Sequence, residues 1–206
     1  MPKGMDNSTL ILYAARDVFL DRGYRVTSMD VVAQAAGVSK ATVYALFTSK
    51  DRLFAAVIER EGDNQTTAID ANTAAPVADV LGQFATDAAA LLLSASNTAM
   101  TRTVSSESVR APEVGRLFYA NGPDRLIARL AGYLAQAMRR GELRKANPRL
   151  AAAQFLAVIV GDLQLRMAMG LPSPSRAEQR TVAKAGVDMF IRAYQPETKI
   201  VRRPHR

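Results

Sequence analysis

The stretch from residue 27 to residue 53, TSMDVVAQAAGVSKATVYALFTSKDRL, constrains the fold of this chain more than any other segment. Its first half has the i, i+3, i+4, i+7 spacing of a helix with one buried face, formed by Met29, Val32, Ala33 and Ala36. Thr27 is a suitable N-cap for that helix. Gly37 supplies the left-handed residue that a tight turn needs, and Ser39 can cap the helix that follows. The segment therefore predicts a helix-turn-helix.

The second helix of this motif has two faces of different chemistry. Val43, Leu46 and Phe47 are spaced to face inward. Four residues are then left pointing outward, with Thr42 at their margin: Lys40, Ala41, Tyr44 and Ala45. A short, small-sided and polar face of this kind suits entry into a DNA major groove, which is roughly 12 Å wide. We therefore expect this helix to bring hydrogen-bond donors to base edges.

The motif resembles the DNA-binding signature of the TetR family of transcriptional regulators, whose core runs AGVSKGTLY, where this chain has AGVSKATVY. The alternative, a generic amphipathic hairpin in a larger bundle, is disfavoured by so long a match. The resemblance implies two groups of DNA contacts: Lys40, Ala41 and Tyr44 at bases, and Thr27, Thr42 and Lys50 at phosphates. Ala45 stands where many members place a large or polar side chain, and Leu46 stands where the family usually carries His or Tyr. These departures leave the operator sequence open.

Composition narrows the remaining function classes. The formal charge of +8 favours a polyanionic partner. The chain has no cysteine and one histidine, His205 in the tail, so we expect no catalytic residue, metal site or cofactor. The longest charge-free run, Ala88 to Thr101, is shorter than the roughly 20 apolar residues of a membrane helix, and the N-terminus lacks a signal-peptide core. The sequence therefore predicts a soluble cytoplasmic protein.

Helical periodicity runs through nearly the whole chain without a convincing strand, so the predicted fold is all-α. We expect an N-terminal three-helix helix-turn-helix domain at 1–50, a helical effector-binding and dimerisation domain at 51–195, and a flexible basic tail at 196–206. The expected helices outside the motif lie near residues 8–21, 51–70, 77–94, 98–110, 113–121, 124–140, 148–169 and 175–194. The region from about 100 to 165 more loosely resembles the C-terminal domain of the AefR-like branch of TetR regulators.

The final predicted helix carries two apolar stripes, although the core of one subunit can use only one of them. One stripe is Val182, Ala185, Met189 and Ala193, and the other is Ala183, Val187, Phe190 and Tyr194. We expect a homodimer interface at Val182, Val187, Met189 and Phe190, as the family resemblance also implies; two-fold symmetry would then present two DNA-binding helices to a near-palindromic double-stranded operator. A thick monomeric core with scattered surface methyl groups remains the alternative.

The resemblance further implies a cavity in the second domain for a small hydrophobic effector, neutral or cationic, whose entry releases DNA from a repressor. The candidate lining residues are Phe84, Leu91, Met100, Phe118, Met138, Phe155, Ile159 and Asp162, although each apolar member could instead fill the core. Asp162 should be buried and would meet either Arg166 or a ligand. The alternative function is an effector-independent architectural DNA binder, against which the large second domain argues. An enzyme is not supported.

Overall fold

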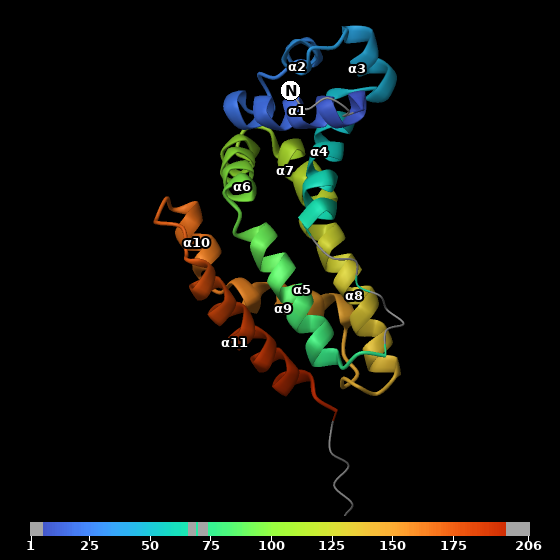
Figure 1. Cartoon of the computed structure of the whole chain (residues 1–206), viewed down its shortest axis with the longest axis vertical. Coiled ribbons are helices and arrows are strands. Elements are labelled where there is room, and N and C mark those ends of the chain that lie inside the picture. The colour runs from blue at the N-terminus through green and yellow to red at the C-terminus, as the bar shows by residue number, and fades with distance from the viewer. Residues whose placement is uncertain (1–5, 66–68, 70–73, 197–206) are drawn as a thin grey trace, which may run out of the picture.

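The structure is a computed structural model in which the described residues, 6–65, 69 and 74–196, form α-helices and connecting loops without a strand (Figure 1). The described helices are α1 Asn7–Arg22, α2 Met29–Ala36, α3 Lys40–Leu46, α4 Lys50–Gln65, α5 Val77–Leu92, α6 Ala95–Ser108, α7 Pro112–Asn121, α8 Pro123–Arg139, α9 Pro148–Val160, α10 Leu163–Ala168 and α11 Arg176–Tyr194. Helices α1–α3 form one end of an elongated molecule, and α5, α8, α9 and α11 pack together at the other. The predicted all-α fold is confirmed.

The helix ends of the predicted motif are set by local hydrogen bonds. Ser39 caps α3 as predicted, its hydroxyl accepting from the Thr42 N–H at 3.0 Å, and Gly37 adopts the left-handed conformation with φ 68°. The predicted N-cap of α2 is wrong. Ser28 takes this role, whereas the Thr27 hydroxyl donates to the Gly23 carbonyl at 2.7 Å. Thr27 therefore closes the turn between α1 and α2 from the inside.

A first core joins α1–α4 to two later helices. Phe54 of α4 makes edge-to-face contacts with Phe19 and Tyr24, with ring centroids 5.0 Å apart in both pairs. Met100 of α6 and Val114 of α7 are buried in the same cluster. The core beneath the helix-turn-helix therefore contains side chains from well beyond residue 50, where we expect the first domain to end.

A second core fills the other end of the molecule, between α5, α8, α9 and α11. Phe155 packs edge-to-face on Phe190 with 5.0 Å between ring centroids, and Phe190 stacks on Tyr194 at 4.4 Å. Val187 is buried in the same cluster. The assignment of Val187 and Phe190 to a dimer interface is thus wrong, because the stripe that contains them supplies the core of a single subunit.

The helix expected at 148–169 is interrupted. Helix α9 ends at Val160, because Gly161 takes a positive φ of 51° that breaks the hydrogen-bond ladder, and α10 begins only at Leu163. Asp162 lies in the break and is exposed, so its predicted burial is wrong, and Arg166 pairs with Glu178 at 2.7 Å. The break turns a single long helix into two short ones.

Two expected segments fall mostly outside the described residues. Helix α4 is described as far as Gln65, so its expected extension to residue 70 lies largely outside them, and of the expected tail at 196–206 only residue 196 is described. No single helix among the described residues has both the length and the apolar character to cross a membrane; the bent pair α5 and α6 passes such a test only when taken together.

The crossing of α9 and α11 depends on one small residue. A Cβ atom added at Gly186 would lie 2.6 Å from the carbonyl oxygen of Val158, which is backbone and cannot rotate away. We expect Gly186→Ala to lower the free energy of unfolding by about 1–3 kcal/mol through overpacking. Gly82→Ala on α5 is the matched control, because an added Cβ there meets nothing within 4 Å. Chemical denaturation measures both, and equal stabilities would contradict the close crossing.

Candidate nucleic-acid interface and cavity

The outer side of α3 is a small polar surface held on the first core by one buried residue. Val43 is fully buried, which orients the helix, and Lys40, Ala41, Tyr44 and Ala45 are exposed as predicted. We call these four exposed residues the α3 face. Leu46 was expected to face inward but is 48% exposed, because the chain becomes extended at Phe47 and only Phe47 turns to the core. The α3 face is therefore bordered by an exposed leucine.

Lys40 is held on this face by a carboxylate of the preceding helix. Its Nζ lies 2.8 Å and 2.9 Å from the two carboxylate oxygens of Asp30, and 5.8 Å from the centroid of the Tyr44 ring. The hydrogen bond and the charge of Asp30 raise the pKa of Lys40. The structure thus gathers Lys40 and Tyr44, two of the predicted base-contacting residues. Sequence analysis did not identify Asp30, because a partner ten residues away across a turn follows no helical spacing.

The three residues expected at phosphates lie in different settings. Thr42 stands at the margin of the α3 face, with its hydroxyl 2.8 Å from that of Ser39. The Nζ of Lys50 donates to the Tyr24 carbonyl at 2.9 Å and lies 4.4 Å from the Tyr24 ring centroid. Thr27 is only 3% exposed, so its side chain is turned away from the surface where a phosphate would lie. Only Thr42 and Lys50 are therefore available at the surface.

Tyr24 is a further residue of this region that sequence analysis missed. Its hydroxyl donates to a carboxylate oxygen of Asp51 at the start of α4. Burial raises the pKa of the Tyr24 hydroxyl, and the hydrogen bond to Asp51 raises it further, so the group remains a protonated donor. Together with the Lys50 contacts, this bond fixes the start of α4 against the turn between α1 and α2.

A cavity of about 160 Å³ lies beneath the helix-turn-helix, between α4, α5, α6, α7 and α8. Three of the predicted lining residues, Leu91, Met100 and Phe118, belong to its wall. The other five do not: Phe84, Met138, Phe155 and Ile159 are packed in the second core, and Asp162 is exposed. Periodicity identifies the buried faces of helices but does not tell which of them meets a void.

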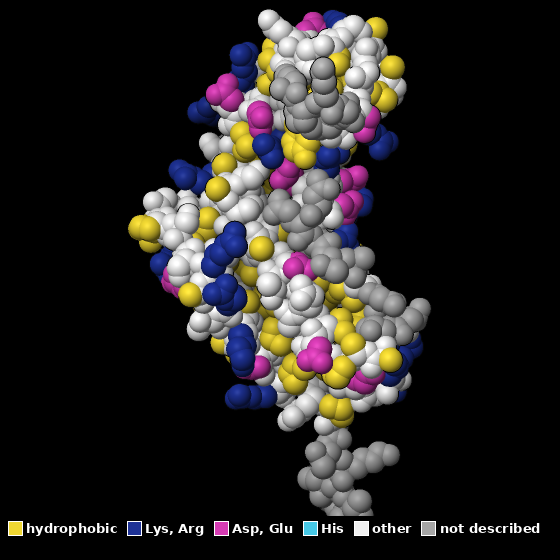
Figure 2. Space-filling model, in the orientation of Figure 1, with side chains coloured by type: hydrophobic (Ala, Val, Ile, Leu, Met, Phe, Trp, Pro, Cys, Tyr) yellow, Lys and Arg dark blue, Asp and Glu magenta, His cyan; other side chains and the backbone are white. Residues whose placement is uncertain are grey.

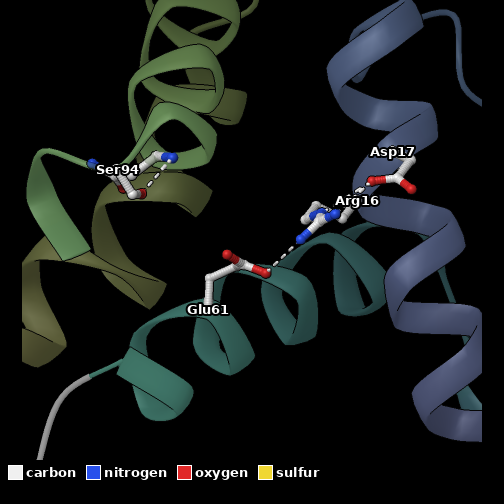
Figure 3. Close-up of polar contacts among 5 residues, drawn as sticks. Arg16, Asp17, Glu61 and Ser94 are labelled. Carbon is white, nitrogen blue, oxygen red and sulfur yellow. Dashed lines mark hydrogen bonds and ion pairs between the residues drawn. The ribbon is translucent and has the colours of Figure 1, made fainter. Parts of the chain in front are cut away.

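Ion pairs between helices distant in sequence cross the edge of the cavity. Arg125 and Arg129 of α8 pair with Glu59 and Asp63 of α4, and acidic and basic side chains lie next to one another on this side of the molecule (Figure 2). Figure 3 shows a further pair: the side chain of Arg16 on α1 lies between Asp17 of the same helix and Glu61 of α4, and Ser94 caps the start of α6. The cavity is thus apolar inside and charged at its rim.

Comparison with known proteins agrees with this architecture. The model "Bacterial regulatory proteins, tetR family" matches residues 11–57, and the model "AefR-like transcriptional repressor, C-terminal domain" matches residues 79–196. Among solved structures, the flavonoid-responsive regulator FrrA is 34% identical with a TM-score of 0.74, over 93% of this chain and 98% of FrrA. A putative TetR-family regulator of Mesorhizobium loti is 27% identical with a TM-score of 0.77, over 95% and 100% of the two chains.

A curated relative matches a part of the chain. The HTH-type transcriptional activator FasR of Mycolicibacterium smegmatis is 46% identical over 59 residues, which are 29% of this chain and 27% of FasR. A helix-turn-helix domain followed by a helical domain, with these relatives, defines a DNA-binding transcriptional regulator rather than an enzyme. The chain belongs to the TetR family, with a C-terminal domain of the AefR-like type.

The pair between Asp30 and Lys40 generates a prediction about DNA discrimination. A carboxylate beside a DNA-binding face repels phosphates of any sequence, so Asp30→Asn should raise the affinity for random DNA and also free Lys40 to move. We expect the ratio of operator to random-DNA affinity to fall about fivefold. Asp21→Asn, an equal change of charge at the end of α1, is the control for net charge. Fluorescence anisotropy with both DNAs measures the ratio, and an unchanged ratio contradicts the role given to Asp30.

Proposed function

We propose that the protein is a cytoplasmic, ligand-responsive repressor that binds its operator as a homodimer and releases it when a small, largely apolar molecule enters the cavity. The position of the cavity is the observation that carries this proposal. Its wall includes α4, which starts at the helix-turn-helix, and one residue of α1, so its occupancy can favour one placement of the DNA-binding helices over another. We propose repression rather than activation because the AefR-like repressor model matches residues 79–196, whereas the activator FasR matches only 59 residues.

For DNA contacts, we propose that Lys40, Ala41 and Tyr44 approach base edges and that Thr42 and Lys50 approach phosphates. The exposure of the α3 face and the marginal place of Thr42 support this division. The buried Thr27 is omitted, because its hydroxyl is already used by the Gly23 carbonyl.

This division predicts two different mutant phenotypes. Tyr44→Ala should weaken operator binding about tenfold and leave binding to random DNA nearly unchanged, because base contacts carry sequence preference. Lys50→Ala should weaken binding to both DNAs and lower the slope of log affinity against log salt by about one, because it removes a phosphate contact. Titrations at several salt concentrations separate the two effects. Equal losses of affinity for operator and random DNA in Tyr44→Ala would show that Tyr44 makes no base contact in the groove.

For the dimer, we propose an interface on the outward side of α9–α11. Within the final helix, Val182 packs against the edge of the second core, whereas Ala185, Met189 and Ala193 of the same stripe are exposed. Large apolar side chains that are more than half exposed also occur on α9, on α10 and just after it: Leu150, Leu165, Met169 and Leu171. Hydrophobic side chains are visible at the outer end of α10 (Figure 2). An apolar surface of this extent favours burial against a second subunit.

Met189 is the residue with which to test the interface. It is 53% exposed on α11, so a charge there is tolerated in one subunit but would be buried in the proposed dimer. We expect Met189→Glu to weaken dimerisation about 100-fold and to reduce operator binding with it. Val109→Glu, an equal change at an 83% exposed residue after α6, is the control. A Met189→Glu protein that sediments as a tight dimer would place the interface elsewhere.

For the effector, the cavity favours a neutral molecule. Three carboxylates and three guanidinium groups belong to its wall: those of Glu59, Glu61 and Asp63, and those of Arg16, Arg125 and Arg129. A strongly charged ligand of either sign would meet no net counter-charge and would lose water without compensation. FrrA is described as responsive to flavonoids, so neutral flavonoids are the first compounds to test on this chain.

A compound screen tests the regulatory function as a whole. An effector present at 100 times its dissociation constant should stabilise the protein by about 2.7 kcal/mol, visible as a higher melting temperature. The same compound should release labelled operator DNA. Stabilisation without release would make the cavity a site that does not regulate. If no compound in a broad neutral aromatic panel does either, the protein is better described as an effector-independent DNA binder, which would coat DNA generally rather than protect one short operator.

A further inference from the structure

Arg16 gives the cavity a direct connection to the DNA-binding domain. Among the described residues of the cavity wall, it is the one contributed by helices α1–α3, while the others come from α4 onward. Helix α1 packs along α2, so that α1 and the helix-turn-helix are parts of one core. A change at Arg16 therefore acts on the element that carries the α3 face.

The Arg16 guanidinium is held firmly on one side and loosely on the other. Its Nε and Nη2 donate to one carboxylate oxygen of Asp17 at 3.0 Å and 2.9 Å, whereas its Nη1 lies 3.4 Å from Oε1 of Glu61. Charge-assisted hydrogen bonds of this type usually measure about 2.7–2.9 Å. The contact between Arg16 and Glu61 is thus the weak link, and both side chains are mostly buried, at 28% and 23% exposed. Figure 3 shows the two groups meeting between α1 and α4.

We propose that the effector is a neutral, largely apolar molecule with a hydroxyl group that inserts between Arg16 and Glu61, and that Arg16 transmits this insertion to α1. The inference rests on the proposed effector function of the cavity. A hydroxyl group donates one hydrogen bond and accepts others, so it can donate to Glu61 and accept from Arg16 at once. A carboxylate in the same place could accept from Arg16 but has no proton to donate to Glu61, whose carboxylate it would face directly.

The rest of the cavity sets the size and character of the molecule. Beside the ion pair, the wall is mostly apolar, with Leu91, Met100 and Phe118 on three different helices, and it also includes polar side chains: Ser96, Asn97, Thr101, Asn121 and Gln164. Its volume of about 160 Å³ is close to that of engineered apolar cavities of roughly 150 Å³ that bind benzene. A phenol with a short alkyl group is therefore the smallest ligand that satisfies both the apolar wall and the pair.

Insertion of a hydroxyl group requires movement. Two hydrogen bonds of about 2.8 Å meeting at one oxygen place the outer atoms roughly 4.5 Å apart. The Arg16 and Glu61 atoms are 3.4 Å apart, so α1 and α4 must separate locally or the side chains must rotate, and the direct contact between Arg16 and Glu61 is lost in either case. Phe19 and Phe54 still join the two helices. Loss of the contact between Arg16 and Glu61 in the occupied state alone is the differential interaction that a ligand needs to alter DNA affinity.

The first experiment tests the ligand class with three probes of one shape. We expect para-ethylphenol to raise the melting temperature of the parent protein and to release operator DNA. Its methyl ether, para-ethylanisole, accepts but does not donate, and should bind about tenfold more weakly, while para-ethylbenzoate should not bind. Equal binding of the phenol and its ether, or tighter binding of the benzoate, overturns the proposed ligand class.

The second experiment tests Arg16 itself. We expect para-ethylphenol to raise the operator dissociation constant about tenfold in the parent and less than about twofold in Arg16→Gln, even where the probe still stabilises that variant. Arg22→Gln on the same helix removes an equal charge outside the cavity and should respond like the parent. Arg16→Lys, which keeps a charged donor, should retain part of the response. A full response of a folded Arg16→Gln protein overturns the role of Arg16.

The two levels of the proposal fail in different ways. If neither these probes nor any neutral aromatic compound stabilises the parent, the effector function of the cavity fails, and this inference falls with it. If other neutral compounds stabilise the parent and release operator DNA while the phenol does not, or while Arg16→Gln still responds fully, only the inference about the hydroxyl group and Arg16 is wrong.

Discussion

Helix α4 belongs to both halves of the molecule, and the placement of the DNA-binding helices depends on this. Its first turns are fixed by burial: Leu53 and Phe54 are inaccessible to solvent, and Phe54 contacts the rings of Phe19 and Tyr24. Its later turns are attached to α1 and α8 by ion pairs at the rim of the cavity. Coupling between the cavity and the α3 face can use this helix, its neighbour α1, or α6, whose Met100 belongs to both the cavity wall and the first core.

The buried contacts at the start of α4 are stronger than the ion pairs of its later turns. A ligand can therefore change the ion pairs more easily than the buried contacts. Burial of a side chain such as Phe54 contributes about 1.5–3 kcal/mol, whereas an exposed ion pair contributes about 0–1 kcal/mol, a range that suits Arg125 with Glu59 better than the more buried Arg16 with Glu61. The start of α4 therefore moves with the helix-turn-helix as one body, while the contacts of its later turns can exchange at little cost. A small ligand supplies a few kcal/mol at most, which is enough to change the ionic contacts and too little to open the aromatic core.

Sequence analysis predicted the helix-turn-helix well because its signals are local: a capping serine, a left-handed glycine and a buried valine each act within one or two helical turns. It placed Val187 and Phe190 at the interface together with Val182 and Met189, because the two stripes of α11 are about equally apolar and only packing on α9 distinguishes them. The pairs of Arg16 with Glu61 and of Lys40 with Asp30 were missed for the same reason. They depend on where helices meet in three dimensions, which residue spacing does not encode.

Charge explains why DNA binding and dimerisation belong together in this molecule. The formal charge of the whole chain is +8, yet Lys40 of the α3 face is paired with Asp30, and Lys50 is engaged by two backbone carbonyl groups. Two of the cations expected at DNA are therefore already engaged, which weakens the electrostatic attraction of a single subunit for phosphates. Joining two such faces makes the second binding event intramolecular, which raises the affinity without any new contact. Because a stronger dimer interface would then compensate for a weakly charged DNA-binding face, the interface proposed on the outer side of α9–α11 would contribute to operator affinity together with α3.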